Sequence, residues 1–289
     1  VSIFIHAIQK FRISAFQPST VFASVSAASI TVYGTFSSPL REAPTSPHKR
    51  CSWVASTEMA GDAVIVAEAE GIWRITAGVF ASNCYAVATS SPGGCALIDP
   101  GLGGVEIHAE LVRLGLRPHA VLCTHGHFDH GGSAALFQRE YGCPVFLHSQ
   151  DVKTLKASNF LLMAFKIEAR VEQPEVDVID AARAVVEVDG CQFEFVHAPG
   201  HTPGSCAISF RTHLFTGDTL YARGVGLSKL PGEKPDQLRA SLSRLLADFP
   251  ADTSIHPGHA ESATLGWISH NNHALRRFLS SPAYTSSDQ

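Results

Sequence analysis

The sequence of 289 residues lacks several features that mark common classes of protein. It has no unbroken run of the roughly 18–20 apolar residues that a membrane-spanning helix needs, so we expect no membrane partner. It has no basic excess, because the net charge is −4, and this argues against a nucleic-acid partner. Its seven cysteines are scattered without a C-x-x-C pair, which argues against a disulfide framework or a cysteine zinc site and favours a reducing, cytoplasmic compartment.

The first seventy residues differ in composition from the rest of the chain. Up to Arg50 there are five Lys and Arg but only one acidic residue, Glu42, and no helical or strand period persists. Such a segment is typical of an organelle transit peptide, which would make the location organellar. We favour a second interpretation, an upstream or dispensable leader, because the first residue is Val and Met59 precedes the first convincing strand. Either way, residues 1–70 are predicted to be a poorly structured leader outside the fold.

Residues 71–289 have the pattern of a single α/β domain. Apolar spacing predicts two series of strands, at 72–80, 83–89, 95–98, 119–123 and 144–147, then at 184–188, 192–197, 206–210, 213–215 and 254–255. Helical spacing follows within each series, at 105–114, 133–141 and part of 150–171, then at 236–248 and 267–279. Two halves of this kind predict sheet packed on sheet with helices outside.

Four side chains of metal-binding type lie within six residues, directly after an expected strand. The segment T-H-G-H-F-D-H-G-G places His125, His127, Asp129 and His130 at the carboxyl end of that strand, where α/β proteins usually have their sites. Alternate side chains of an extended segment point the same way, so His125 and His127 can bind one ion together. Asp129 and His130 follow as the chain turns into a helix and can bind at a second position. Imidazoles and carboxylates suit zinc, and also iron or manganese.

Three more turns, each after an expected strand, offer further ligands. A-P-G-H-T-P-G-S contains His201, T-G-D-T contains Asp218, and H-P-G-H contains His259. The carboxylate of Asp218 has two oxygens and can bridge two ions. We expect Gly126 to allow backbone angles that a bulkier residue would resist. We expect Asp99 to orient a ligand or cap a turn, since ligating imidazoles usually need a hydrogen-bond acceptor behind them.

Together these segments resemble the metallo-β-lactamase fold superfamily in order and spacing, with I-D-P-G upstream of them. The resemblance covers about residues 71–278 and implies the αββα four-layer sandwich with two divalent metal ions. It implies that the first ion is held by His125, His127 and His201, the second by Asp129, His130 and His259, and that Asp218 bridges them.

Within this superfamily, G-H-T-P-G-S-C and P-D-Q-L-R-A-S-L look most like the small hydroxyacylglutathione hydrolase (glyoxalase II) branch. That likeness implies a thioesterase acting on a small molecule, in which water activated by the two ions attacks the thioester carbonyl and Asp129 orients the water and takes its proton. The chain departs from the branch at 227–229, where Lys229 is a candidate for binding an anionic substrate.

Two other activities of the same fold stay open. A lactonase would use the same ligands on a cyclic ester. An iron-dependent persulfide dioxygenase needs few second-site ligands, whereas His130 and His259 are both present here.

The leader can be tested by truncation. A chain beginning at Met59 should unfold with the same free energy as the full chain and hydrolyse substrate equally well, because residues 1–58 show no core periodicity. Chemical denaturation of both chains measures this, and a deficit of several kcal/mol in the shorter one would contradict it.

Overall fold

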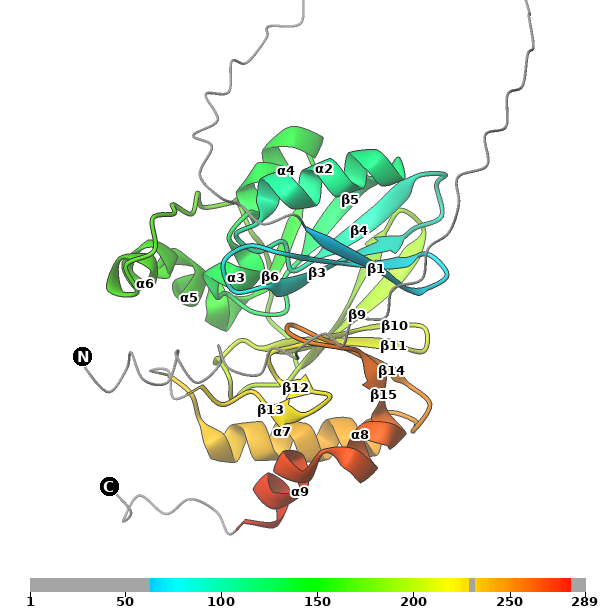
Figure 1. Cartoon of the computed structure of the whole chain (residues 1–289), viewed down its shortest axis with the longest axis vertical. Helices are drawn as coiled ribbons and strands as arrows, with labels where there is room; N and C mark the ends of the chain where they lie inside the picture. The colour runs from blue at the N-terminus through cyan, green and yellow to red at the C-terminus, as the bar shows by residue number, and fades with distance from the viewer. Residues whose placement is uncertain (1–62, 229–231, 282–289) are drawn as a thin grey trace, which may run out of the picture. The chain divides into compact units, whose positions relative to one another are not determined.

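The structure, a computed structural model, describes residues 63–228 and 232–281 (Figure 1). The leader expected over residues 1–70 therefore lies mostly outside the described residues, and so does Lys229. No helix in the described part of the chain is long and apolar enough to cross a membrane.

The first sheet has seven strands in the order of the sequence, antiparallel from β1 to β4 and parallel from β4 to β7. The strands are β1 (Val64–Ala69), β2 (Ile72–Ala77), β3 (Ser82–Ala88), β4 (Gly94–Ile98), β5 (Arg117–Leu122), β6 (Val145–His148) and β7 (Asp177–Ile179). The strands β3 and β4 are almost wholly buried on both faces, which explains their nearly continuous small and apolar residues.

The second sheet has six strands in the order β15-β14-β11-β10-β9-β8. The strands are β8 (Arg183–Val188), β9 (Cys191–His197), β10 (Cys206–Phe210), β11 (His213–Gly217), β14 (Ser254–Pro257) and β15 (Ala263–Thr264), and a separate pair consists of β12 (Leu220–Tyr221) and β13 (Gly224–Val225). Strands β11 and β14 are parallel, so the turns that follow them lie at the same edge of the sheet.

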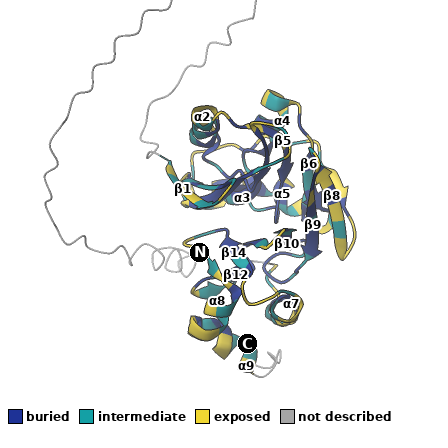
Figure 2. Cartoon of the chain, turned by 90° about the vertical axis from the view of Figure 1, so that its right-hand side faces the viewer, coloured by how far each residue is buried: buried dark blue, intermediate teal, exposed yellow. Residues whose placement is uncertain are grey.

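The two sheets pack on each other through a shared apolar core. Tyr85 and Ile98 of the first sheet lie in one buried cluster with Phe193, Phe195 and Phe215 of the second. The outer face of the first sheet is covered by α2 (Gly104–Leu114) and α4 (Ala134–Tyr141), and that of the second by α7 (Pro235–Asp248), α8 (Leu265–Asn271) and α9 (His273–Ser280). Figure 2 shows the buried strands between helices whose outer sides are exposed. The expected αββα sandwich is confirmed.

Short helices occupy the end of the sandwich where ligand-bearing turns gather. They are α3 (Phe128–Gly131), a 3₁₀ turn (Ser149–Asp151), α5 (Val152–Lys156) and α6 (Ser158–Ala164). The last two divide the segment expected to be partly helical over 150–171.

Two expected boundaries differ in the structure. Strand β1 lies before Gly71, the expected start of the domain, and pairs with β2. None of its residues is fully buried, because it is an edge strand, although its first four residues, V-I-V-A, are apolar. The single C-terminal helix expected over 267–279 is two helices. Asn272 separates them because its side chain accepts a hydrogen bond from the backbone of Leu275 and donates to the carbonyls of Tyr221 and Gly224.

Candidate metal centre

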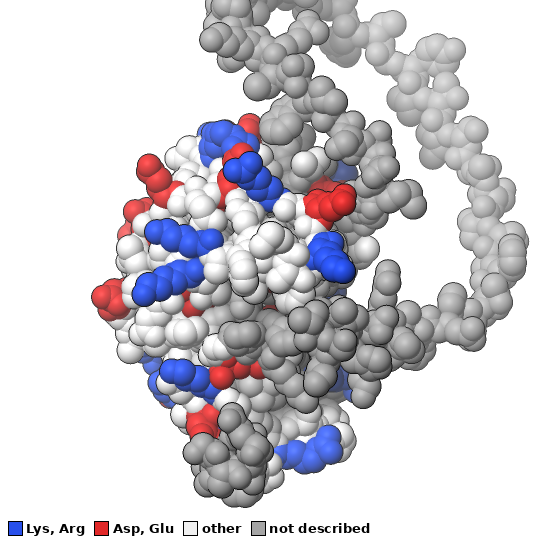
Figure 3. Space-filling model, turned by 90° about the vertical axis from the view of Figure 1, so that its left-hand side faces the viewer, with Lys and Arg blue, Asp and Glu red and all other residues white. Residues whose placement is uncertain are grey.

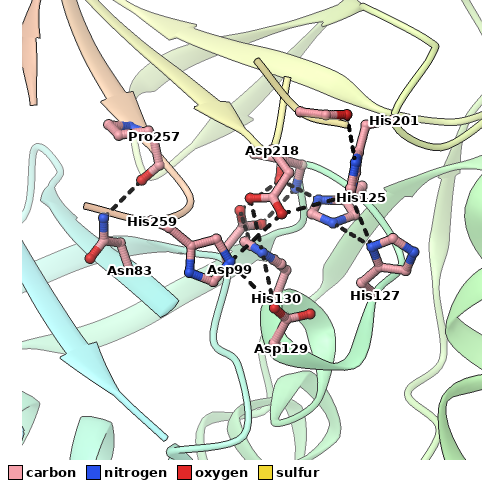
Figure 4. A network of polar contacts seen from close by, with 12 residues as sticks. Asn83, Asp99, His125, His127, Asp129, His130, His201, Asp218, Pro257 and His259 are labelled. Atoms are coloured by element: carbon pink, nitrogen blue, oxygen red, sulfur yellow. Dashed lines mark hydrogen bonds and ion pairs between the residues drawn. The ribbon is translucent and has the colours of Figure 1, made fainter. Parts of the chain in front are cut away.

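The seven candidate ligands all lie in segments that follow the carboxyl ends of strands from both sheets, and Asp129 and His130 lie in the short helix α3 (Figure 4). The turn after β5 carries His125, His127, Asp129 and His130, the turn after β9 carries His201, the turn after β11 carries Asp218, and the turn after β14 carries His259. The structure thus brings together residues that are up to 134 positions apart in the sequence, from His125 to His259.

A first group consists of three imidazoles. Nδ1 of His127 lies 3.1 Å from Nε2 of His125 and 3.1 Å from Nε2 of His201. One nitrogen from each ring can therefore face a common point, and the three lie within 4.8 Å of one another. These are the three side chains that the family resemblance implies for the first ion.

A second group consists of Asp129, His130 and His259. Oδ2 of Asp129 lies 3.4 Å from Nε2 of His259 and 3.6 Å from Nε2 of His130. These three also form a group that could hold an ion. We call the two groups the first and the second triad.

The carboxylate of Asp218 lies between the triads. Its Oδ1 is 3.3 Å from Nε2 of His130, while its Oδ2 is 3.6 Å from Nε2 of His259 and 3.7 Å from Nε2 of His201. One carboxylate therefore faces ligands of both triads, which is the arrangement needed for a bridging ligand.

The polar atoms of the site fit a metal ion better than they fit one another. Nε2 of His130 and Oδ1 of Asp218 are buried without a hydrogen-bond partner, which is costly unless a further group satisfies them. Burial, with the neighbouring His201, lowers the pKa of His127 to about 3, so its imidazole is neutral and keeps a free lone pair. Burial and the ring of His130 also lower the pKa of His125. Neutral imidazoles beside carboxylates are the donors that zinc, iron and manganese accept.

The second triad carries the negative charge of the site. Burial alone would raise the pKa of Asp129, but His130 and His259 outweigh it and lower the pKa to about 2. Burial alone would likewise lower the pKa of His130, yet the carboxylates of Asp218 and Asp129 raise it well above its usual value. This part of the site therefore favours a positive charge, which a divalent cation supplies.

Hydrogen bonds behind the rings fix which nitrogen faces the site. Oδ2 of Asp99 lies 3.2 Å from Nδ1 of His130, and the same carboxylate accepts hydrogen bonds from the backbone and hydroxyl of Thr124. Nδ1 of His201 lies 3.1 Å from the carbonyl oxygen of Gly226. In both rings Nδ1 is the donor to an oxygen behind the ring, which leaves Nε2 facing the site. The expected orienting contact of Asp99 is present.

Two glycines admit close approach within the site. A Cβ on Gly258 would collide with Oδ1 of Asp218 and Cε1 of His130, so no larger residue fits there. Gly126 was expected to allow unusual backbone angles, but it is not among the glycines with positive φ. Its Cβ would instead meet the backbone oxygen of Asp151, and space is therefore the reason for this glycine.

Three residues of the site were not identified from the sequence. Asn83 and Asp151 make buried contacts to the ligand-bearing turns, and Tyr221 has its ring centre 6.4 Å from that of His259. Burial and the carboxylate of Asp218 raise the pKa of Tyr221, so its phenol stays protonated. The one feature of the sequence that could have pointed to Tyr221 is that it lies three residues after the candidate ligand Asp218.

Comparison with known proteins defines the class. The family model described as "Metallo-beta-lactamase superfamily" matches residues 77–259. The chain therefore belongs to the metallo-β-lactamase superfamily, and it is a metal-dependent hydrolase.

Individual relatives span the described domain. An uncharacterized protein of Aquifex aeolicus is 33% identical over 194 residues, which are 66% of this chain and 90% of the relative. A hydroxyacylglutathione hydrolase of Haemophilus influenzae is 29% identical over 204 residues, which are 67% of this chain and 92% of that enzyme. A crystal structure of TTHA1623 in a di-iron-bound form is 34% identical with a TM-score of 0.62, covering 69% of this chain and 98% of that one.

The two triads predict a definite metal content. Protein saturated with Zn²⁺ and then dialysed should retain about two ions per chain, because each triad offers three ligands and Asp218 adds oxygens to both. His259→Ala should retain about one ion, since the first triad is untouched. Elemental analysis per chain measures this, and His270→Ala, an exposed histidine on α8, is the control. Retention of a single ion by the unaltered protein would contradict the two-ion prediction.

Proposed function

We propose that the protein is a dinuclear metal-dependent thioesterase of the hydroxyacylglutathione hydrolase type, acting on a small-molecule thioester or ester. The observation that carries the proposal is the pair of triads with the Asp218 carboxylate between them. The likeness to a hydroxyacylglutathione hydrolase supports the thioester as substrate.

The proposed ligands divide as the triads do. His125, His127 and His201 would hold one ion, Asp129, His130 and His259 the other, and Asp218 would contact both. When bound, two such ions lower the pKa of water towards about 7 and polarise the substrate carbonyl.

Within this site Asp129 is the residue that handles the proton. With its pKa lowered to about 2, it is a carboxylate throughout the neutral range and can only accept hydrogen bonds. Its Oδ2 faces Nε2 of His130 and Nε2 of His259, the other two members of the second triad. From there Asp129 can accept a hydrogen bond from the attacking water, orient that water and take up its proton.

A thioester suits this set of residues better than an amide. A thiolate is a stable leaving group and departs without a strong general acid. The carboxylates of Asp129 and Asp218 are both deprotonated, because their pKa values are lowered by the neighbouring imidazoles against the effect of burial. In the resting site neither therefore carries a proton that it could donate to a poor leaving group.

The metal, the partners and the location belong to the same proposal. We propose zinc, with iron or manganese as alternatives, and the di-iron form of a relative supports iron. We propose neither a nucleic-acid nor a membrane partner. On the face shown in Figure 3, described Lys and Arg are interspersed with Asp and Glu, which supports a small-molecule substrate. Six described cysteines are buried and free, which supports a reducing, cytoplasmic location.

A substrate panel tests the thioesterase against its alternatives. Zn²⁺-loaded protein should release free thiol from hydroxyacyl-glutathione thioesters, measured with a thiol reagent, and His125→Ala should abolish the release. Lactones and, on the iron-loaded protein with O₂, glutathione persulfide are offered in parallel. Turnover of lactones alone would replace the thioesterase with a lactonase. Oxygen consumption with persulfide alone would replace it with a dioxygenase.

The role of Asp129 is tested by Asp129→Ala. The variant should lose about 10²-fold or more in kcat for a thioester, the scale expected when a positioned acid–base group is lost. KM should change less, because the carboxylate acts on the water and not on the substrate. Asp252→Ala, which removes an exposed aspartate that is not a candidate ligand, is the matched control. Nearly full kcat in Asp129→Ala would contradict this mechanism.

A further inference from the structure

We infer that two buried polar residues, Asp151 and Asn83, are positioning residues that each set the geometry of one triad independently of the other. The inference rests on the metal site of the proposed function, but it concerns ion binding and not the substrate.

The need for such residues follows from the origin of the ligands. In the first triad, His125 and His127 come from the first sheet and His201 from the second. In the second triad, Asp129 and His130 come from the first sheet and His259 from the second. Each triad therefore has its geometry only when a turn of one sheet is held in place against a turn of the other.

Asp151 joins the two turns of the first triad. Asp151 is fully buried. Its Oδ2 accepts hydrogen bonds from the backbone N–H of Gly126 at 2.8 Å and from the hydroxyl of Thr202 at 2.6 Å. Its Oδ1 accepts one from the backbone of Gly204 at 2.8 Å. Gly126 lies between His125 and His127, and Thr202 follows His201. One carboxylate thus connects the turns that carry all three imidazoles.

The two glycines beside Asp151 have a steric reason that agrees with this role. A Cβ on Gly126 would meet the backbone oxygen of Asp151, and a Cβ on Gly204 would meet its backbone nitrogen and Cβ. Both turns can approach Asp151 only because neither carries a side chain at that point. The three donors then compensate the buried charge.

Asn83 joins the two sheets at the second triad. Asn83 is fully buried on β3, and its Nδ2 donates to the carbonyl oxygen of Pro257 at 3.0 Å (Figure 4). It also donates to the carbonyl oxygen of Ala260 at 2.8 Å. Its backbone N–H donates to the carbonyl oxygen of Gly258 at 2.7 Å. These three carbonyls surround His259 in the sequence. Thr76 donates to Oδ1 of Asn83 at 2.8 Å and so fixes which way the amide faces.

The two residues have opposite hydrogen-bonding roles, so one isosteric exchange disrupts each. Asp151→Asn replaces an acceptor oxygen with a donor that must face an N–H or O–H group. Asn83→Asp replaces a donor with an oxygen that faces two carbonyl oxygens. Both exchanges preserve size and shape, and each is the control for the other.

The experiment measures Zn²⁺ affinity at one triad at a time. His259→Ala removes a ligand of the second triad and leaves the first intact, whereas His127→Ala does the reverse. Asp151→Asn and Asn83→Asp are each introduced into both backgrounds. Equilibrium dialysis against a Zn²⁺ chelator then gives the dissociation constant of the remaining ion, and circular dichroism of the metal-free proteins monitors folding.

The expected result is a crossed pattern. Asp151→Asn should weaken Zn²⁺ binding about 10–100-fold in the His259→Ala background and hardly at all in the His127→Ala background, and Asn83→Asp should do the opposite. General destabilisation of the fold would weaken Zn²⁺ binding to the same extent in both backgrounds, for either exchange. Such a uniform loss, or no loss at all, would overturn the inference.

Milder variants keep the test decisive if an exchange prevents folding. Thr202→Val removes one donor to Asp151, and Thr76→Val removes the donor to Asn83, while both positioning side chains remain. The same crossed pattern is expected with smaller changes. Two ions bound by the unaltered protein without thioester hydrolysis would contradict the proposed function and leave this inference standing.

Discussion

The arrangement of the site depends on one interaction, that of the buried Asp218 carboxylate with the three imidazoles of His130, His201 and His259. Its oxygens lie 3.3–3.7 Å from nitrogens that belong to both triads. A buried charge of this kind is costly without compensation, so the surrounding chain has to hold positive or cation-binding groups close to it. Gly258 allows Asp218 and His130 to lie this close to each other, because a Cβ at this position would collide with both side chains.

The fold positions the candidate ligands by placing them directly after the carboxyl ends of strands. Parallel neighbours bring the turns after β4 and β5 to one edge of the first sheet, and the turns after β11 and β14 to one edge of the second. The shared core around Phe193 and Phe195 then fixes one sheet on the other. The chemistry of a metal-dependent hydrolase thus follows from the packing of two sheets, and neither sheet alone carries a full triad.

The candidate ligands could be found in the sequence because each stands in a local pattern of histidine or aspartate with glycine after an apolar strand. The residues behind them could not. Asn83 follows Ser82 at the start of a strand and stands in no recognisable motif. Asp151 occupies the cap position of α5 but makes no hydrogen bond to the backbone of that helix, because its carboxylate turns to Gly126 and Gly204. A local sequence pattern favours the capping role, and only the tertiary structure shows the other partners.

The division of each triad between the sheets also has a consequence for the lifetime of the protein. An ion that binds only when both sheets are in place stabilises the folded chain by RT ln(1 + [ion]/Kd), which is about 2.7 kcal/mol at a free concentration of 100 times Kd. The unfolded fraction available to proteases then falls by about a hundredfold when the metal is plentiful. With two ions bound as proposed, resistance of the chain to proteolysis would therefore rise with the free concentration of its metal.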